Sequence, residues 1–244
     1  MRETGSEIDM ADHTEANSGI NQNPKWLEWG LSLIAICLAA YMFYATVFGP
    51  YRTTLVHRAI FLGPVLFIYF LNSHRLGDGW KRAVDVILAV LAICVTSYVV
   101  FNYEHIADLI GASLLTQLDL IVGGLLLLIV LEAARRQSFL FFIIAVVCVV
   151  YTLYGQHFPG LFRHAGIDIK RFIFLNAFGP EGVFGVGLAV ATNYLFMFIL
   201  LGTALQASGT SKFVLDIAEA VVGHLPGGAG KVSLFASAGL GTMV

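Results

Sequence analysis

Six long runs of apolar residues, separated by short islands of charge, constrain this chain of 244 residues more than any other feature. They occupy Trp26–Phe48, Ala59–Asn72, Val84–Tyr103, Leu114–Leu131, Ser138–Gly155 and Val183–Ala207. A helix of about 20 apolar residues crosses the hydrocarbon core of a bilayer, which is about 30 Å thick. Only 12% of the residues are charged, about half the usual share in a soluble domain. The sequence therefore predicts an all-α, polytopic helical membrane protein with about six transmembrane helices.

The second run is shorter than the others and contains Pro64. We expect this helix to be tilted, kinked, or lengthened by the residues that flank it. The first 25 residues are polar and poor in aromatic side chains. They predict a disordered cytoplasmic tail rather than a signal peptide, because no apolar core begins before Trp26.

The basic residues predict how the chain is oriented in the membrane. They lie in the second, fourth and sixth connections, at His74, Arg75, Lys81, Arg82, Arg135, Arg136 and Lys212. Because cytoplasmic loops are rich in lysine and arginine, this pattern places the N-terminus in the cytoplasm. A further basic group falls on the outer side, in and around "DIKRFIFLNAF" (168–178). An amphipathic segment lying on the membrane surface would account for it.

A different pattern follows the sixth run. In "SKFVLDIAEAVVGH" (211–224) the charged residues Lys212, Asp216 and Glu219 recur at helical spacing, and apolar residues fill the other side. This predicts an amphipathic helix along the membrane surface. The next stretch, "GHLPGGAGKVS" (223–233), has the glycines and lysine of a phosphate-binding loop but the wrong spacing, since Leu225 stands where the first glycine is needed. We therefore expect a turn between helices.

The final stretch, "ASAGLGTMV" (236–244), places small and hydroxyl residues within an apolar segment. Small residues permit close helix packing in membranes. They also suit one arm of a re-entrant hairpin, in which backbone carbonyls and hydroxyls bind a cation or a polar substrate. The residues alone leave both interpretations open. Thr192 and Asn193, polar residues in the sixth run, either line a path or hydrogen-bond a neighbouring helix.

Catalytic and metal-binding patterns are not found in the sequence. No histidine pair has metal-ligand spacing, and no nucleophile motif is present. We therefore expect no enzyme activity, no metal site and no cofactor. Asp119 and Glu132, in or near the fourth run, are candidates for a role inside the membrane. Cys37, Cys94 and Cys148 lie within apolar runs, and we expect buried, inert thiols.

The order of motifs in the C-terminal third resembles that of one transporter family. The motifs are "EGxFG" at Glu181–Gly185, then Phe198, Gly202, Leu205, Ser208 and Gly209, then Gly223, Gly227, Gly228, Lys231 and Val232, and finally Ala236–Ala238 with Gly241. The series resembles the membrane component of the tripartite ATP-independent periplasmic (TRAP) transporters, most of all the fused permeases of the TAXI branch. The resemblance covers about residues 115–244. Gly187 departs from it, because the family pattern has proline there.

The resemblance implies a division of the chain. Residues 1–25 are the tail, and 26–113 are similar to the small membrane subunit in hydropathy and order. Residues 114–210 would begin the large permease subunit, with scaffold helices and a periplasmic-side arm segment. Residues 211–244 would hold the amphipathic surface helix and the truncated first arm of a re-entrant hairpin. The tip of that hairpin is expected after Val244, in the remainder of the permease.

The resemblance also implies a function. A multi-pass permease of the bacterial inner membrane would take up an organic solute, expected to be a carboxylate, that a periplasmic solute-binding protein delivers. An elevator motion would be driven by a coupling cation, sodium or proton. The candidates for the cation or substrate site are Ser237, Gly239, Gly241 and Thr242, with Thr192 and Asn193 as possible path-lining residues. Gly227, Gly228 and Lys231 would form the turn at the start of the hairpin.

Two other functions compete with transport. The chain could be a non-transporting scaffold or assembly subunit, or a truncated fragment without independent activity. An intramembrane enzyme is disfavoured because no catalytic pair is found. The expected partners are the lipid bilayer, the binding protein and the rest of the permease. A net charge of −2 predicts no nucleic-acid partner.

Overall fold

The computed structural model describes residues 25–72, 79–112, 115–160, 163–222 and 228–243, and all regular elements within these ranges are helical. The longer helices are α2 (Lys25–Phe48), α3 (Thr54–Asn72), α4 (Gly79–Phe101), α5 (Tyr103–Ala112), α6 (Gln117–Gln137), α7 (Phe139–Tyr154), α10 (Phe196–Ala207), α11 (Thr210–Val222) and α12 (Gly228–Met243). The shorter ones are η1 (Gly155–His157), α8 (Ile169–Ile173), η3 (Phe174–Phe178), α9 (Val186–Val190) and η4 (Ala191–Leu195).

Six described segments are long and apolar enough to cross a membrane. They are Leu27–Phe48, Thr54–Asn72, Gly79–Phe101, Gln117–Gln137, Phe139–His157 and Val186–Ala207. The prediction of an all-α polytopic membrane protein is confirmed. Flanking residues lengthen the second span, which is one of the predicted alternatives: α3 begins at Thr54, ahead of the apolar run, and continues through Pro64.

Several helices begin or end at other residues than the predicted runs. α6 continues past Leu131 to Gln137, because the charged side chains of its last turns pair with one another and remain helical. The sixth span begins at Val186 rather than Val183, because tight turns precede it. α5 is a further helix in the connection that follows the third span.

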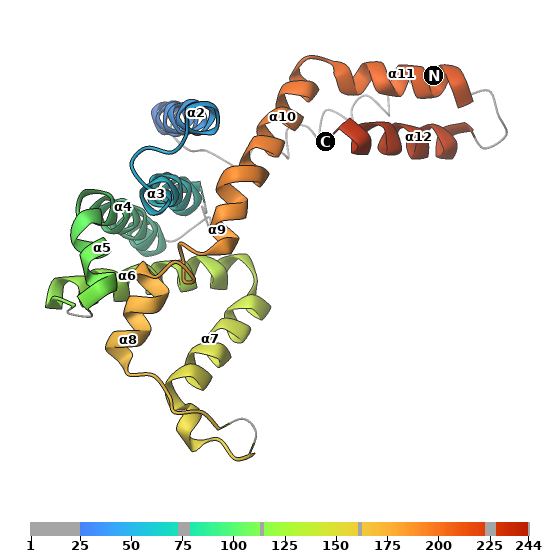
Figure 1. Cartoon of the computed structure of the whole chain (residues 1–244). Helices are drawn as coiled ribbons and strands as arrows, with labels where there is room; N and C mark the ends of the chain where they lie inside the picture. The colour runs from blue at the N-terminus through green and yellow to red at the C-terminus, as the bar shows by residue number, and fades with distance from the viewer. Residues whose placement is uncertain (1–24, 73–78, 113–114, 161–162, 223–227, 244) are drawn as a thin grey trace.

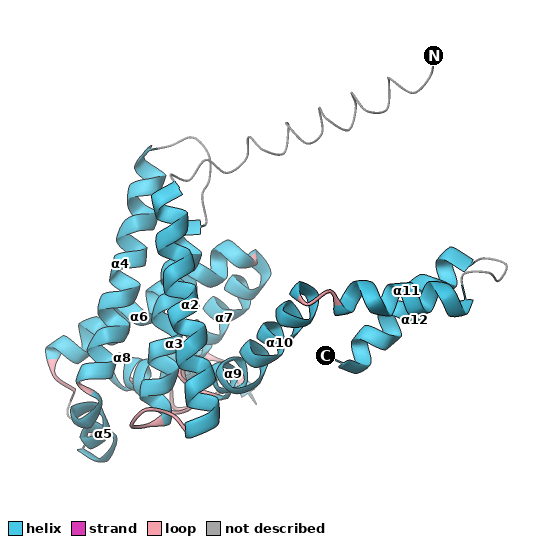
Figure 2. Cartoon of the chain, turned by 90° about the horizontal axis from the view of Figure 1, so that it is seen from above, coloured by secondary structure: helices cyan, strands magenta, loops and turns pink. Residues whose placement is uncertain are grey.

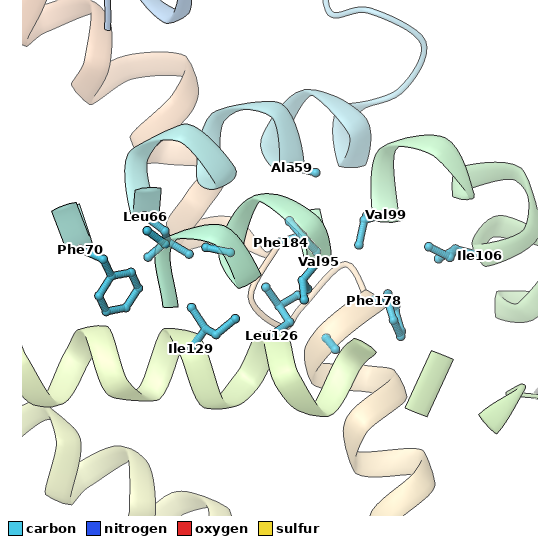
Figure 3. Close-up of a cluster of buried hydrophobic side chains, with 13 residues drawn as sticks. Ala59, Leu66, Phe70, Val95, Val99, Ile106, Leu126, Ile129, Phe178 and Phe184 are labelled. Carbon is cyan, nitrogen blue, oxygen red and sulfur yellow. The ribbon is translucent and has the colours of Figure 1, made fainter. Parts of the chain in front are cut away.

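The core lies between α3, α4 and α6 (Figure 3). Ala89 and Ala92 of α4 are fully buried, and small side chains allow helices in membranes to approach closely. Larger side chains fill the space between these helices and the turn after η3, among them Phe70, Leu126, Ile129, Phe178 and Phe184. The N-terminal spans and the start of the C-terminal half therefore share one core.

The segment "DIKRFIFLNAF" forms α8 and the π-helical turn η3. Lys170 and Arg171 are exposed, whereas Ala177 and Phe178 are fully buried. Ile173 packs against the core from the same segment. The amphipathic character predicted from the sequence is present, and the apolar side contacts the protein.

Two helices extend away from this bundle. Figure 1 shows α10 leading out to α11 and α12, and Figure 2 shows the same two helices side by side. Ala218 and Val222 of α11 are buried. Much of the remaining apolar surface of the pair is exposed, including Phe213, Ile217, Val221, Leu234 and Phe235. We call α11 and α12 the C-terminal hairpin.

The lone chain exposes apolar side chains along several spans. α7 and α10 have no buried residue among those described. Cys37, Cys94 and Cys148 are also exposed, so the prediction of buried thiols is wrong. The reason is that an apolar run in a membrane protein faces lipid as often as protein, and hydropathy does not distinguish the two sides.

Two neighbouring glycines of α6 give a matched test of the packing against α8 and η3. A Cβ atom on Gly123 would lie 2.8 Å from Ile173 Cγ2 and 2.9 Å from Phe178 Cε2. A Cβ atom on Gly124 would approach no closer than 4.0 Å, to Ile173 Cδ1. Only the first position is too tight for an added methyl group.

We expect Gly123→Ala to lower the free energy of unfolding by about 1–3 kcal/mol through overpacking. Gly124→Ala should be neutral or stabilising by up to about 1 kcal/mol, since alanine favours helix more than glycine does. Thermal unfolding in detergent, followed by tryptophan fluorescence, measures both variants. Equal effects of the two substitutions would contradict the packing described here.

Candidate functional site

A pocket of about 370 Å³ lies where α2, α3 and η4 meet. We call it the α2–α3 pocket. No acidic side chain is among the described residues that line it, and several of the lining residues carry hydrogen-bond donors. The lining residues are Ala45, Thr46, Gly49, Pro50, Thr54, His57, Arg58 and Asn193. The pocket joins residues of the N-terminal spans to one residue of the sixth span.

His57 is the most buried polar side chain of this pocket, with 7% of its surface exposed. Its Nδ1 atom lies 3.3 Å from the Tyr41 hydroxyl, and the two rings are tilted with centroids 5.7 Å apart. When Tyr41 donates to Nδ1, the neutral imidazole carries its hydrogen on Nε2. Nε2 has no hydrogen-bond partner within the part of the chain that the structure describes.

Arg58 connects α3 to the "EGVFG" turn. One of its guanidinium nitrogens donates to the backbone carbonyl of Phe184, whose side chain is buried. The turn is tight, with Gly185 N–H donating to the Gly182 carbonyl at 2.8 Å. A Cβ atom on Gly185 would lie 2.7 Å from that carbonyl oxygen, which explains a glycine at this position.

Thr192 and Asn193, the predicted path-lining residues, lie together on the π-helical turn η4. Such turns occur often at functional sites. Thr192 is buried and its hydroxyl donates to the Ala189 carbonyl at 3.1 Å. Asn193 is exposed and lines the α2–α3 pocket. The structure thus brings Asn193, but not Thr192, to the same pocket as His57 and Arg58.

The remaining candidates lie far along the chain, in the C-terminal hairpin. Ser237, Gly239, Gly241 and Thr242 all belong to α12, which is helical to Met243. Gly228 is the first residue of α12 and Lys231 lies in its first turn, so these two residues begin the helix. Gly227 lies outside the described residues. Ser237 and Gly241 are exposed.

The C-terminal half of the chain matches a known family. Residues 125–244 match the family model described as the tripartite ATP-independent periplasmic transporter, DctM component. This region is DctM-like. It runs from the middle of α6 through the "EGVFG" turn, η4, α10 and the hairpin, and it supports a membrane component of a TRAP permease. No curated protein and no solved structure is significantly similar to the chain.

Polar contacts at both ends of α6, the helix in which the DctM-like region begins, join α6 to the preceding helices. At the first end, the Asp119 side chain is fully buried. It accepts hydrogen bonds from the Tyr98 hydroxyl at 2.7 Å and from Thr116 N–H at 3.0 Å. His105 Nε2 lies 3.3 Å from Oδ2 of Asp119, the same oxygen that accepts from Thr116. Asp119 therefore links α4, α5 and the first turn of α6.

At the second end, Glu132 forms an ion-pair cluster with two arginines. Arg135 reaches both of its carboxylate oxygens at 2.7 Å. Arg136 bonds Glu132 at 2.8 Å and also bonds Asp85 of α4. Trp80 and Lys81 flank the cluster around a shallow pocket. Asp119 and Glu132, both proposed from the sequence as intramembrane acids, are each held by partners within the chain.

Sequence reasoning missed His57 and Arg58, because they precede the apolar run that begins at Ala59 and read as a basic connection. A usable signal was nevertheless present, since ionisable residues within a membrane helix often mark a functional site. Among the described residues, no group of three or more histidine, cysteine, aspartate or glutamate side chains gathers as a metal site would require.

Proposed function

We propose that the chain acts in a fused TRAP permease of the TAXI type. It takes up an organic carboxylate that a periplasmic binding protein delivers, and a sodium or proton gradient drives an elevator motion. The observation that carries the proposal is the DctM match over residues 125–244, which includes the whole C-terminal hairpin.

The arrangement of the helices supports a division of labour. α3, α4 and α6 share a packed core, which suits a fixed scaffold. The C-terminal hairpin extends away from that core on α10 and exposes apolar side chains (Figure 1). We propose that these side chains contact lipid and the rest of the permease. Ser237, Gly239, Gly241 and Thr242 of α12 are then the chain's contribution to the cation or substrate site.

The ion-pair cluster supports the proposed orientation. Asp85 near the start of α4 contacts Arg136 near the end of α6, so two basic islands lie at one end of the bundle. Because lysine and arginine favour the inner side, we place this end in the cytoplasm. The N-terminus is then cytoplasmic, the membrane is the bacterial inner membrane, and the α2–α3 pocket lies toward the periplasm.

Uptake by the full-length permease tests the proposal. Proteoliposomes that hold the permease, with the binding protein outside, should accumulate a labelled carboxylate when a sodium or a proton gradient is imposed. Ser237→Ala should lower the uptake rate about tenfold or more if the hydroxyl binds the cation. Ser233→Ala, one turn earlier on α12, should leave the rate unchanged.

Three results would contradict the proposal. One is uptake that requires ATP, and another is uptake that does not depend on the binding protein. The third is gradient-driven uptake by vesicles that hold only these 244 residues, since the proposed site needs the remainder of the permease. Binding of the periplasmic protein without any uptake by the full permease would favour the scaffold function instead.

A further inference from the structure

We propose that the α2–α3 pocket is a binding site for a small organic carboxylate. Its donors come from the consecutive helices α2 and α3 and from η4, which lies far along the chain. Binding by the pocket stands on its own geometry. A role as an outer holding site for the transported solute rests on the proposed function.

The charge and the hydrogen-bonding groups of the pocket favour an anion. Arg58 supplies a permanent positive charge, and no carboxylate is among the described lining residues to neutralise it. A buried polar group without a partner is costly, and the buried His57, whose Nε2 has no partner among the described residues, lines the pocket. In the tautomer that Tyr41 favours, Nε2–H donates to whatever occupies the pocket.

The backbone adds to this preference. Thr53 precedes α3, and its hydroxyl accepts from Val56 N–H at 3.4 Å, as an N-terminal cap does. Thr54, the first residue of α3, lines the pocket. The positive end of the helix dipole of α3 therefore lies beside it, where it stabilises a bound negative charge.

Arg58 and Asn193 give the site its specificity for a carboxylate. Arg58 commits one nitrogen to the Phe184 carbonyl, and its remaining N–H groups form a planar fork that matches a carboxylate. Asn193 adds an amide to the pocket lining from the π-helical turn η4. The volume of about 370 Å³ is sufficient for a compact organic acid.

The position of the site fits a solute that arrives from outside. In the proposed orientation, the α2–α3 pocket lies at the periplasmic ends of α2 and α3. It also borders the DctM-like region through Asn193 and through the bond from Arg58 to Phe184. A carboxylate held there contacts both the N-terminal spans and the sixth span.

Calorimetric titration of the purified chain in detergent tests the site. The probes are acetate and succinate, with succinamide as the uncharged analogue and chloride as a simple anion. We expect saturable binding of at least one carboxylate and no binding of succinamide. Asn193→Ala should raise the dissociation constant about tenfold, as expected for one hydrogen bond to a charged group. Thr203→Ala, on the exposed side of α10, is the matched control and should change nothing.

Arg58→Gln should abolish binding. Because Arg58 also bonds the Phe184 carbonyl of the "EGVFG" turn, the thermal unfolding of this variant must be measured as well. Asn193→Ala keeps the test decisive if the Arg58 variant unfolds, because the exposed Asn193 side chain is not needed for packing. Absence of saturable binding, equal affinity for chloride and carboxylate, or an unchanged constant in Asn193→Ala would each overturn the proposal. The titration uses no gradient and no binding protein, so its failure is distinct from a failure of transport.

Discussion

Replacing Arg136 by alanine is expected to lower the free energy of unfolding by about 3 kcal/mol, because it removes the guanidinium that bonds the partly buried carboxylates of Asp85 and Glu132. Arg135→Ala should cost less than about 1 kcal/mol, as exposed ion pairs usually do. The two arginines are adjacent in sequence and both contact Glu132. Their different surroundings, and not their chemistry, separate the two expected effects.

The Arg136 side chain, on α6, contacts side chains of α3, α4 and α6. Its side chain is 15% exposed, and that of its partner Asp85 is 13% exposed. It bonds Asp85 on α4 and Glu132 on α6. Its guanidinium also lies 5.2 Å from the centroid of the Phe70 ring on α3, where a cation–π contact adds to the attraction. Arg135, by contrast, is 51% exposed, and among the described residues its side chain hydrogen-bonds only to Glu132 of its own helix.

Thermal unfolding of each variant in detergent measures the difference. Arg136→Lys is an informative third variant, because a lysine keeps the charge but cannot bond both carboxylates as the planar guanidinium does. We expect its stability to fall between those of the wild type and Arg136→Ala. If Arg135→Ala were as destabilising as Arg136→Ala, the cluster would not act through its contact with α4.

The spans could be predicted from the sequence because hydropathy is a local property. Each run of apolar residues gives a helix whether or not its neighbours are known. The amphipathic pattern of residues 211–222 is local in the same way, and α11 forms there. Such signals require only the spacing of residues along one helix.

The contacts between helices could not be predicted in this way. The sequence marks Asp119 and Glu132 as acids in or near a membrane span. It does not show that Tyr98 of α4 donates to Asp119, or that Arg136 joins Glu132 to Asp85 of α4. Which side of a span faces protein is likewise invisible in hydropathy, as the exposed Cys148 shows. The π-helical turns η3 and η4 have no composition signal, because they depend on the packing around them.

The α2–α3 pocket combines one residue that the sequence singles out with two that it does not. Asn193 is a visible polar exception within an apolar run, and it is one of the pocket's lining residues. His57 and Arg58 lie at the edge of a different run and resemble an ordinary basic loop. Only the fold brings residues 57, 58 and 193 to one place.

Asp119 gives the second large expected effect. Asp119→Ala should lower the free energy of unfolding by about 3 kcal/mol, because it leaves the Tyr98 hydroxyl and Thr116 N–H without their charged acceptor. Asp119→Asn should cost about half as much. The amide keeps one acceptor oxygen, but it presents N–H groups to a second donor.

Asp108→Asn is the matched control, because Asp108 lies exposed on the neighbouring helix α5. Its effect should be below about 0.5 kcal/mol. A double-mutant cycle of Asp119→Ala with Tyr98→Phe should give a coupling energy above about 1 kcal/mol, since the two side chains are in direct contact. Additive effects of the two substitutions would contradict the hydrogen bond between them.

The same variants decide between a structural and a transport role for Asp119. An acid that binds the coupling cation must release its partners or share them during each cycle, whereas this carboxylate already accepts from α4 and from the first turn of α6. If Asp119 acts only by joining these helices, Asp119→Asn in the full-length permease lowers the unfolding temperature but leaves the cation dependence of uptake unchanged. A changed cation dependence at normal stability would instead place Asp119 on the coupling path.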